Sequence, residues 1–151
     1  MQPAANPYLR TKILTASPEE LRLMLYDGAI KFARHARTAL DERRYEEMFT
    51  SLTRAQKIVL ELSTSLKPEI DPDLCGKLGA LYNYIYRLLV DAHVEKSTRK
   101  LDEAIELLSF ERQTWQLLIQ KLADENRSAA AAALDIVEHQ QTALSSLSRS
   151  A

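Results

Sequence analysis

Long segments in which apolar residues recur every three or four positions constrain the fold of this chain more than any other feature. Four such segments run over about residues 17–44, 45–67, 71–96 and 97–123. This spacing places the apolar side chains on one face of an α-helix. The chain has only 3 glycines and 5 prolines among 151 residues, so long helices are favoured over a multi-stranded sheet with many turns.

Proline-containing sequences mark where these helices are expected to begin and end. The stretch 17–20 (Ser-Pro-Glu-Glu) is a capping box with proline at the first helical position. Pro68 ends the second segment, and the pair Asp71-Pro72 begins the third. Because short links force neighbouring helices to run antiparallel, the sequence predicts an all-α fold, an antiparallel up-down four-helix bundle.

Two flanking segments differ in composition from the bundle domain expected over residues 17–123. Residues 1–16 contain two prolines and no convincing helix cap. We expect them to form an N-terminal arm outside the main fold, either as a disordered terminus or as a segment that docks on its own domain. Residues 124–151 form an Ala/Ser-rich tail in which Leu134, Val137 and Leu144 could mark a fifth, C-terminal helix.

Residues that could carry catalysis or hold a metal are scarce. The three histidines, His35, His93 and His139, are far apart, and the Glu-x-x-His, CxxC and HExxH patterns are missing. The glycines are too scattered for a nucleotide-binding loop. Cys75 is the single cysteine, interpreted as a small core residue in a reducing compartment. We therefore expect a binding protein without metal or cofactor, and not an enzyme.

The overall charge argues against two classes of partner. The net charge is −1, which indicates no general affinity for nucleic acid or for an acidic membrane surface.

No uninterrupted apolar run is long enough to span a bilayer, so no membrane insertion is expected. Prolines and basic residues interrupt the N-terminal segment where a signal peptide would be apolar. The predicted location is the cytoplasm.

The first and third segments carry more apolar surface than a simple bundle requires. Each helix needs an apolar stripe somewhat over about 100° wide. On a helical wheel, apolar residues cover roughly half of the first segment and roughly two-thirds of the third. The third segment also holds Tyr82, Tyr84 and Tyr86, and tyrosine tolerates partial exposure at interfaces. The excess surface could close a homodimer, or it could form a groove for amphipathic helices of a partner.

Several stretches resemble the flagellar secretion chaperone FliS family. Asn6-Pro7-Tyr8 and the stretches 15–21 (TASPEEL) and 23–32 (LMLYDGAIKF) closely resemble the opening of that family. The stretches 55–62 (AQKIVLEL), 81–92 (LYNYIYRLLVDA) and 112–115 resemble its later helices, so the similarity covers about residues 6–122. The chain departs from the family pattern at residues 10–13, at Leu88 and at His93.

The resemblance implies a cytosolic export chaperone. Such a protein binds the C-terminal segment of flagellin, prevents premature polymerisation and keeps the subunit competent for flagellar type III secretion, where the export gate could be a second partner. The family arm can occupy part of the same surface. The alternative is a helical homodimeric adaptor or regulatory protein without flagellin binding.

Candidate partner-binding residues follow from the helical wheels. Residues 78, 81, 85, 88 and 92 are predicted to face the core, which leaves Tyr82, Tyr86 and His93 on one flank of the third helix and Leu89 at the boundary. Phe49, Gln56 and Leu60 form the corresponding flank of the second helix, and the first helix near Tyr26 is the alternative groove. The candidate set is Tyr8, Ile13, Leu25, Tyr26, Phe49, Gln56, Leu60, Tyr82, Tyr86, Leu89 and His93.

Overall fold

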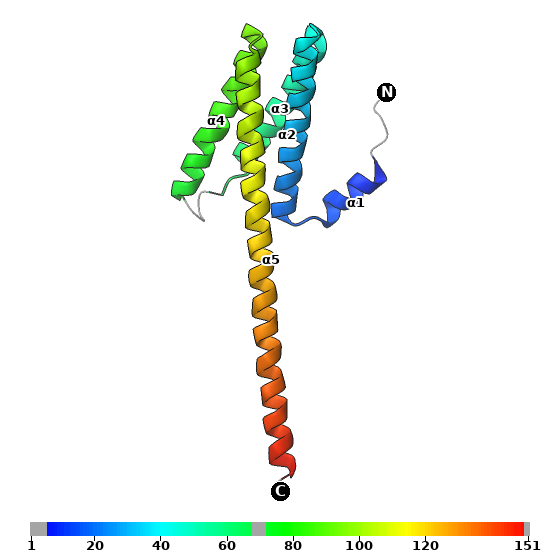
Figure 1. The fold of residues 1–151 in the computed structure, drawn as a ribbon, viewed down its shortest axis with the longest axis vertical. Coiled ribbons are helices and arrows are strands. Elements are labelled where there is room, and N and C mark those ends of the chain that lie inside the picture. The colour runs from blue at the N-terminus through cyan, green and yellow to red at the C-terminus, as the bar shows by residue number, and fades with distance from the viewer. Residues whose placement is uncertain (1–5, 68–71, 150–151) are drawn as a thin grey trace. The chain divides into compact units, whose positions relative to one another are not determined.

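The computed structural model describes residues 6–67 and 72–149, and every regular element in these ranges is an α-helix. The elements are α1 (Pro7–Thr15), α2 (Pro18–Asp41), α3 (Tyr45–Thr64), α4 (Pro72–Glu95) and α5 (Thr98–Arg149). Helices α2, α3, α4 and the first part of α5 run up and down in turn (Figure 1). The predicted all-α, antiparallel four-helix bundle is confirmed. The predicted stop at Pro68 and the cap at Asp71 lie outside the described residues.

The predicted capping box begins α2. The Ser17 hydroxyl accepts a hydrogen bond from the Glu20 backbone N–H at 3.2 Å, and the Glu20 carboxylate accepts one from the Ser17 N–H at 3.1 Å. These two bonds satisfy backbone donors that the first helical turn leaves unpaired. The position at which α2 begins is therefore encoded locally.

Residues in the left-handed conformation follow α2 and α4. Arg43 has φ 56° and Lys96 has φ 52°. The next residue in each case donates its N–H back to the helix, from Arg44 to the Ala39 carbonyl at 2.8 Å and from Ser97 to the Ala92 carbonyl at 3.1 Å. This left-handed cap closes a helix and reverses the chain within a few residues. The cap explains why α2 ends at Asp41. The sequence predicted an end near residue 44.

The core of the bundle is built from all four helices. Small residues line the inner side of α2, where Ala29, Ala33 and Ala36 are fully buried. Small side chains allow neighbouring helices to approach closely. Of the positions predicted to face the core on α4, residues 85, 88 and 92 are buried, while residues 78 and 81 are partly buried against the core.

The arm contains a short helix that the sequence analysis did not expect. The Asn6 side chain accepts a hydrogen bond from the Tyr8 N–H at 3.0 Å, and Pro7 occupies the first helical position of α1. The statement that the arm lacks a helix cap is therefore wrong, since asparagine followed by proline is a good helix start. None of the residues Pro7–Thr15 is buried, so the described part of the arm is not inserted into the core.

Residues 124–149 of the tail are helical, but they do not form a separate fifth helix. Helix α5 continues through the predicted end at residue 123 to Arg149. No glycine or proline interrupts residues 116–149, and alanine has the highest intrinsic helix propensity. The chain divides into two compact units, residues 1–115 and 116–151. The bundle core thus ends near Trp115.

The described residues contain neither a candidate membrane-spanning helix nor a candidate metal site. None of the described helices combines the length and apolarity that crossing a membrane requires. Within the same ranges, no group of three or more His, Cys, Asp or Glu side chains is placed to hold a metal ion.

Candidate partner-binding surface

A contact between two aromatic rings joins the outer sides of α3 and α4. The ring of Phe49 lies 4.8 Å from the ring of His93, centre to centre, at an interplanar angle of 45°. Despite this contact, Phe49 is 51% exposed. The contact fixes the register of two adjacent antiparallel helices.

This register brings five of the predicted partner-binding residues to one side of the bundle. From the Phe49–His93 pair, equal steps along the two antiparallel helices place Gln56 level with Tyr86. Leu60 follows one turn further along α3 and is 54% exposed. Gln56, Tyr86 and His93 are half-buried. We call Phe49, Gln56, Leu60, Tyr86 and His93 the α3–α4 face.

The α3–α4 face contains an unsatisfied polar atom. The His93 Nδ1 atom is buried and has no hydrogen-bond partner among the described residues. Buried polar atoms are normally paired, so such an atom costs free energy in the unbound protein. The face thus combines exposed apolar area with a polar group that lacks a partner.

Three residues predicted to line a groove are instead part of the core. Tyr26, Tyr82 and Leu89 are each 0% exposed. The prediction that the flank of Tyr82 opens to a partner is wrong for this conformation, because the Tyr26 and Tyr82 hydroxyl groups hydrogen-bond to one another inside the bundle. A tyrosine whose hydroxyl has an internal partner can be buried completely. Leu89, placed at the boundary of the wheel, turns to the core side.

The remaining predicted residues lie on other elements. Tyr8 and Ile13 belong to α1 and are 75% and 44% exposed. Leu25 belongs to α2, where it is half-buried against the core. These three are therefore not part of the α3–α4 face.

Arg22 organises a polar cluster inside the bundle that the sequence analysis missed. Its guanidinium donates hydrogen bonds to the Tyr82 hydroxyl at 2.9 Å, the Leu62 carbonyl at 3.0 Å and the Ser65 hydroxyl at 3.0 Å. It also lies 4.9 Å from the centre of the Trp115 ring, a cation–π distance. The sequence did contain a signal for this cluster, because Arg22 lies within the apolar half of the helical wheel of segment 17–44.

Burial changes the proton affinity of two groups near Arg22. Burial, reinforced by the Tyr82 hydroxyl, raises the pKa of Tyr26 far above its ordinary value. Burial also raises the pKa of Glu111 above 4.5, although the positive charge of Arg22 acts in the opposite direction. Both groups are therefore held closer to their neutral forms than in water.

Arg112 lies within the apolar stripe of the fourth segment. A contact with α2 explains its role there. Its Nε atom forms an ion pair with Asp27 of α2. A second ion pair, between Arg37 and Asp102 at 2.7 Å, joins the same two helices nearer their other ends. Both pairs are partly exposed, so they align α2 and α5 more than they stabilise the fold.

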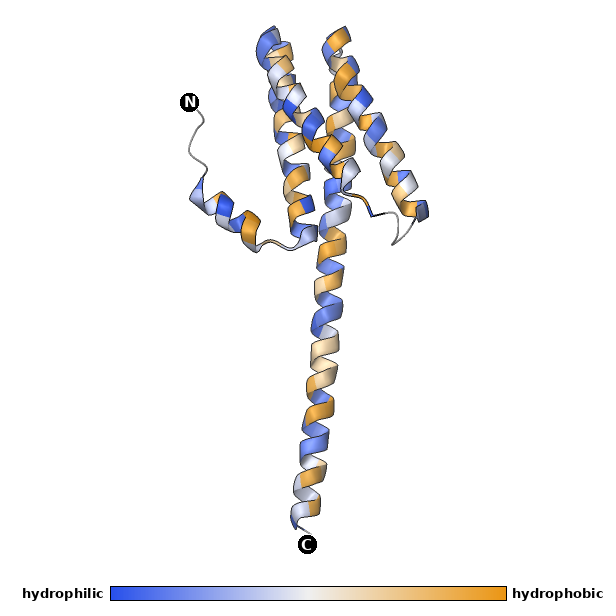
Figure 2. Ribbon diagram, turned by 180° about the vertical axis from the view of Figure 1, so that it is seen from behind, coloured by the Kyte–Doolittle hydropathy of each residue, from blue (hydrophilic) through white to orange (hydrophobic). Residues whose placement is uncertain are grey.

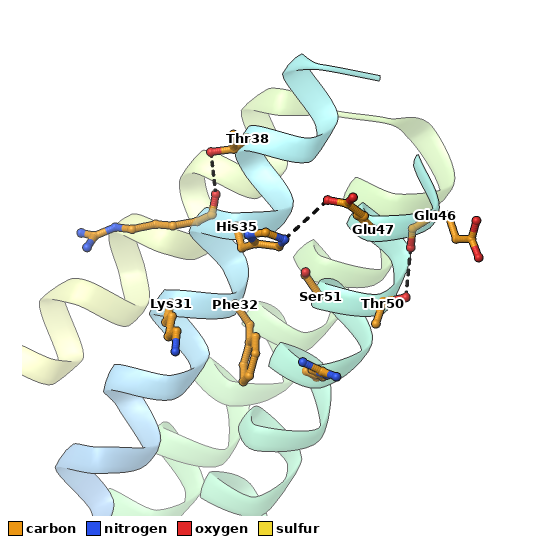
Figure 3. A pocket seen from close by; sticks show the side chains of 10 residues that line it. Lys31, Phe32, His35, Thr38, Glu46, Glu47, Thr50 and Ser51 are labelled. Carbon is orange, nitrogen blue, oxygen red and sulfur yellow. Dashed lines mark hydrogen bonds and ion pairs between the residues drawn. The ribbon is translucent and has the colours of Figure 1, made fainter. Parts of the chain in front are cut away.

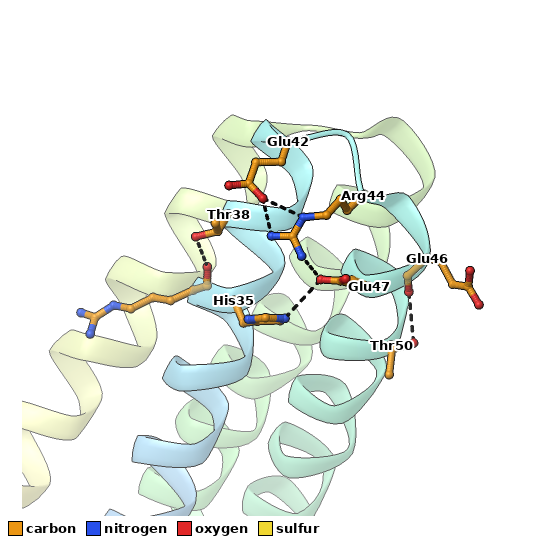
Figure 4. A network of polar contacts seen from close by, with 8 residues as sticks. His35, Thr38, Glu42, Arg44, Glu46, Glu47 and Thr50 are labelled. Carbon is orange, nitrogen blue, oxygen red and sulfur yellow. Dashed lines mark hydrogen bonds and ion pairs between the residues drawn. The ribbon is translucent and has the colours of Figure 1, made fainter.

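A polar depression of about 730 Å³ lies between α2 and α3 (Figure 3). Lys31, Phe32 and His35 line it from α2, and Arg54 of α3 places its guanidinium 5.4 Å from the Phe32 ring centre. At one end Arg44 and His35 both contact Glu47 (Figure 4). The mixed charges of this depression fit an apolar helix less well than the α3–α4 face does.

Comparison with known proteins identifies the family. The model of the family described as "Flagellar protein FliS" matches residues 1–122. The flagellar secretion chaperone FliS of Bacillus subtilis is 37% identical over 118 residues, covering 76% of this chain and 87% of the relative. The FliS protein of Salmonella typhimurium is 27% identical over 118 residues, covering 78% and 87%.

A solved structure supports the fold independently. A crystal structure described as a flagellar chaperone from bacteria superposes with a TM-score of 0.66 at 20% identity, covering 79% of this chain and 99% of that one. The family consists of chaperones rather than enzymes. The chain therefore belongs to the FliS family of flagellar secretion chaperones.

Proposed function

We propose that this protein binds the C-terminal segment of flagellin in the cytoplasm, prevents its premature polymerisation and keeps it competent for flagellar type III export. Membership of the FliS family supports the proposal, as do the names of the relatives. A partner that is unfolded before assembly spends part of its interaction energy on ordering. It therefore needs an extended apolar surface on the chaperone.

The observation that carries the proposal is the exposure of two large apolar side chains on one side of α3. Phe49 and Leu60 are 51% and 54% exposed. They lie three helical turns apart, roughly 16 Å along the axis. An amphipathic helix laid along the α3–α4 face could cover both, with Tyr86 and His93 completing the contact from α4. Large half-exposed apolar groups flanked by half-buried ones are typical of partner-binding surfaces.

Titration of a flagellin C-terminal peptide into variants by calorimetry tests the proposal. We expect Phe49→Asp and Leu60→Asp each to weaken binding at least about tenfold, or about 1.4 kcal/mol, because a charge would enter a surface that the partner must dehydrate. The matched control is Phe110→Asp, a 63% exposed phenylalanine on α5 outside the α3–α4 face. Its affinity should stay near that of the parent.

Each other outcome has a definite meaning. Equal losses in all three variants would show that the α3–α4 face is not the binding surface. A parent protein that ignores the peptide and forms a tight dimer through its bundle would favour the homodimeric adaptor. Binding to export-gate proteins, the second proposed partner, can be titrated with the same variants.

A further inference from the structure

Every residue of the helical segment 116–149 except Ile119, which is half-buried, is exposed to solvent. No residue in this range is buried, and apolar residues recur along it (Figure 2). An isolated helix derives little stability from its own propensity and normally requires a packed face. The family model ends at residue 122, so most of this segment lies outside the matched region. The spacing of residues within the segment itself therefore has to indicate what packs against it.

One stripe along this segment has a regular spacing. At about 100° per residue, Ile119, Leu122, Asn126, Ala129 and Ala133 fall on one side of the helix. The steps between them are 3, 4, 3 and 4 residues. The stripe begins with large apolar residues, passes through one polar residue and ends with small ones.

Beyond Ala133 the stripe repeats itself in reverse. Val137, Gln140, Leu144 and Leu147 continue on the same side, with steps of 4, 3, 4 and 3 residues. The order of residue types is also reversed, with a small β-branched residue first, then one polar residue, then two large apolar ones. The stripe is therefore a palindrome in both spacing and chemistry, centred on Ala133.

We propose that two copies of this chain pair through residues 116–149 as an antiparallel helical coiled coil, with the two-fold axis at Ala133. In this register Ile119 lies level with Leu147 of the partner subunit, and Leu122 lies level with Leu144 of the partner subunit. Each apolar side chain then meets another apolar side chain across the axis. A two-fold interface requires such self-complementarity.

A polar pair sets the register. Asn126 lies level with Gln140 of the partner subunit, so two amides that can hydrogen-bond to one another share one layer of the interface. A shift by one turn would place each amide against an apolar residue and leave it unpaired. A single polar core layer is a recognised determinant of coiled-coil register and orientation.

Side-chain size agrees with this arrangement. Ala129 and Ala133 at the centre allow the two helix axes to approach closely.

Light scattering coupled to size exclusion tests the pairing on the full chain. The parent should have twice the 17.2 kDa chain mass, and the double variant Leu122→Glu, Leu144→Glu should have the mass of one chain. The matched control, Leu117→Glu with Leu134→Glu, changes two exposed leucines off the stripe and should remain dimeric. Circular dichroism melting should show a folded bundle in all three. A monomeric parent, or equal behaviour of the two double variants, would overturn the proposal.

Disulfide trapping tests the orientation in a Cys75→Ser background. Asn126→Cys combined with Gln140→Cys should form a covalent dimer on mild oxidation, whereas Asn126→Cys alone should not. Trapping by the single variant would indicate a parallel pair, and absence of trapping by the double variant would exclude the register. Either result would overturn the proposal. Because the α3–α4 face is unchanged in these variants, the outcome is independent of flagellin binding.

Discussion

The hydroxyl groups of Tyr26 and Tyr82 hydrogen-bond to one another inside the bundle, joining α2 to α4 at a point where both rings are fully buried. The bond explains why a helix with three closely spaced tyrosines turns one of them inward. Tyr84 and Tyr86 stay on the outer sides of α4, where Tyr84 is 45% exposed.

Removal of one hydroxyl should destabilise the bundle. In Tyr82→Phe, the Arg22 guanidinium and the Tyr26 hydroxyl both lose a buried partner, which should lower the free energy of unfolding by about 1–3 kcal/mol. Urea titration followed by circular dichroism measures this change. Tyr84→Phe is the control, because Tyr84 donates to Glu103 at an exposed site, and its effect should stay within about 0.5 kcal/mol. Similar losses in the two variants would contradict the role given to the buried pair.

Glu111 should give the bundle a pH dependence of identifiable sign. Burial raises its pKa in the folded protein above 4.5, so between 4.5 and the raised value the folded state binds more protons than the unfolded state. Stability from this group is therefore fully present below pH 4.5 and is lost as the pH rises through the raised pKa. Glu111→Gln keeps the shape without the charge and should be more stable than the parent at pH 7.

Parallel melting curves of the parent and Glu111→Gln from pH 4 to pH 8 provide the measurement. The difference in stability should grow as the pH rises and then level off, which separates Glu111 from the other carboxylates shared by both proteins. A difference that shrinks with rising pH would mean that attraction to Arg22 outweighs burial.

Helix starts and core faces were accessible from sequence because they depend on local chemistry. The capping box at Ser17 and the core positions of α4 followed from residue type and spacing alone. The inward position of Tyr82 did not, because its hydroxyl is satisfied by Arg22 and Tyr26, which are distant in sequence. A helical wheel shows which residues share one side of a helix. It does not show which polar side-chain groups form hydrogen bonds with other helices.

Two helix boundaries toward the ends of the chain were also not predicted from the sequence. No glycine or proline marks a break near residue 123, and the predicted boundary there reflected a change of composition rather than a stop signal. The Asn6-Pro7 helix start was not predicted, although asparagine followed by proline is a helix-start signal. The wheels placed the residues of the α3–α4 face on facing flanks of their two helices, but the register between the helices required the Phe49–His93 contact.

Adjacent residues on α4 should respond differently to a charge. Ile85 is fully buried, so Ile85→Asp should unfold the protein, whereas half-buried Tyr86 should tolerate Tyr86→Asp with a much smaller loss. In calorimetry, Tyr86→Asp should weaken binding of a flagellin C-terminal peptide by more than about tenfold, since the charge would lie on the α3–α4 face. If Tyr86→Asp melts like Ile85→Asp, Tyr86 belongs to the core. If it folds and binds normally, the contact surface lies elsewhere.

Deletion of residues 1–16 should leave the bundle nearly as stable as in the full chain. None of the residues Pro7–Thr15 is buried, and the capping box that begins α2 lies within residues 17–20, so the deletion removes neither core packing nor the cap. The melting temperature should fall by no more than a few degrees, which corresponds to less than about 1 kcal/mol. Binding of a flagellin C-terminal peptide should be unchanged or tighter, because the exposed Tyr8 and Ile13 could cover the same apolar surface in the unbound protein. A Tyr8→Ser, Ile13→Ser variant of the full chain separates this competition from any effect of chain length. A large loss of affinity in both proteins would instead make the arm a direct part of the binding site.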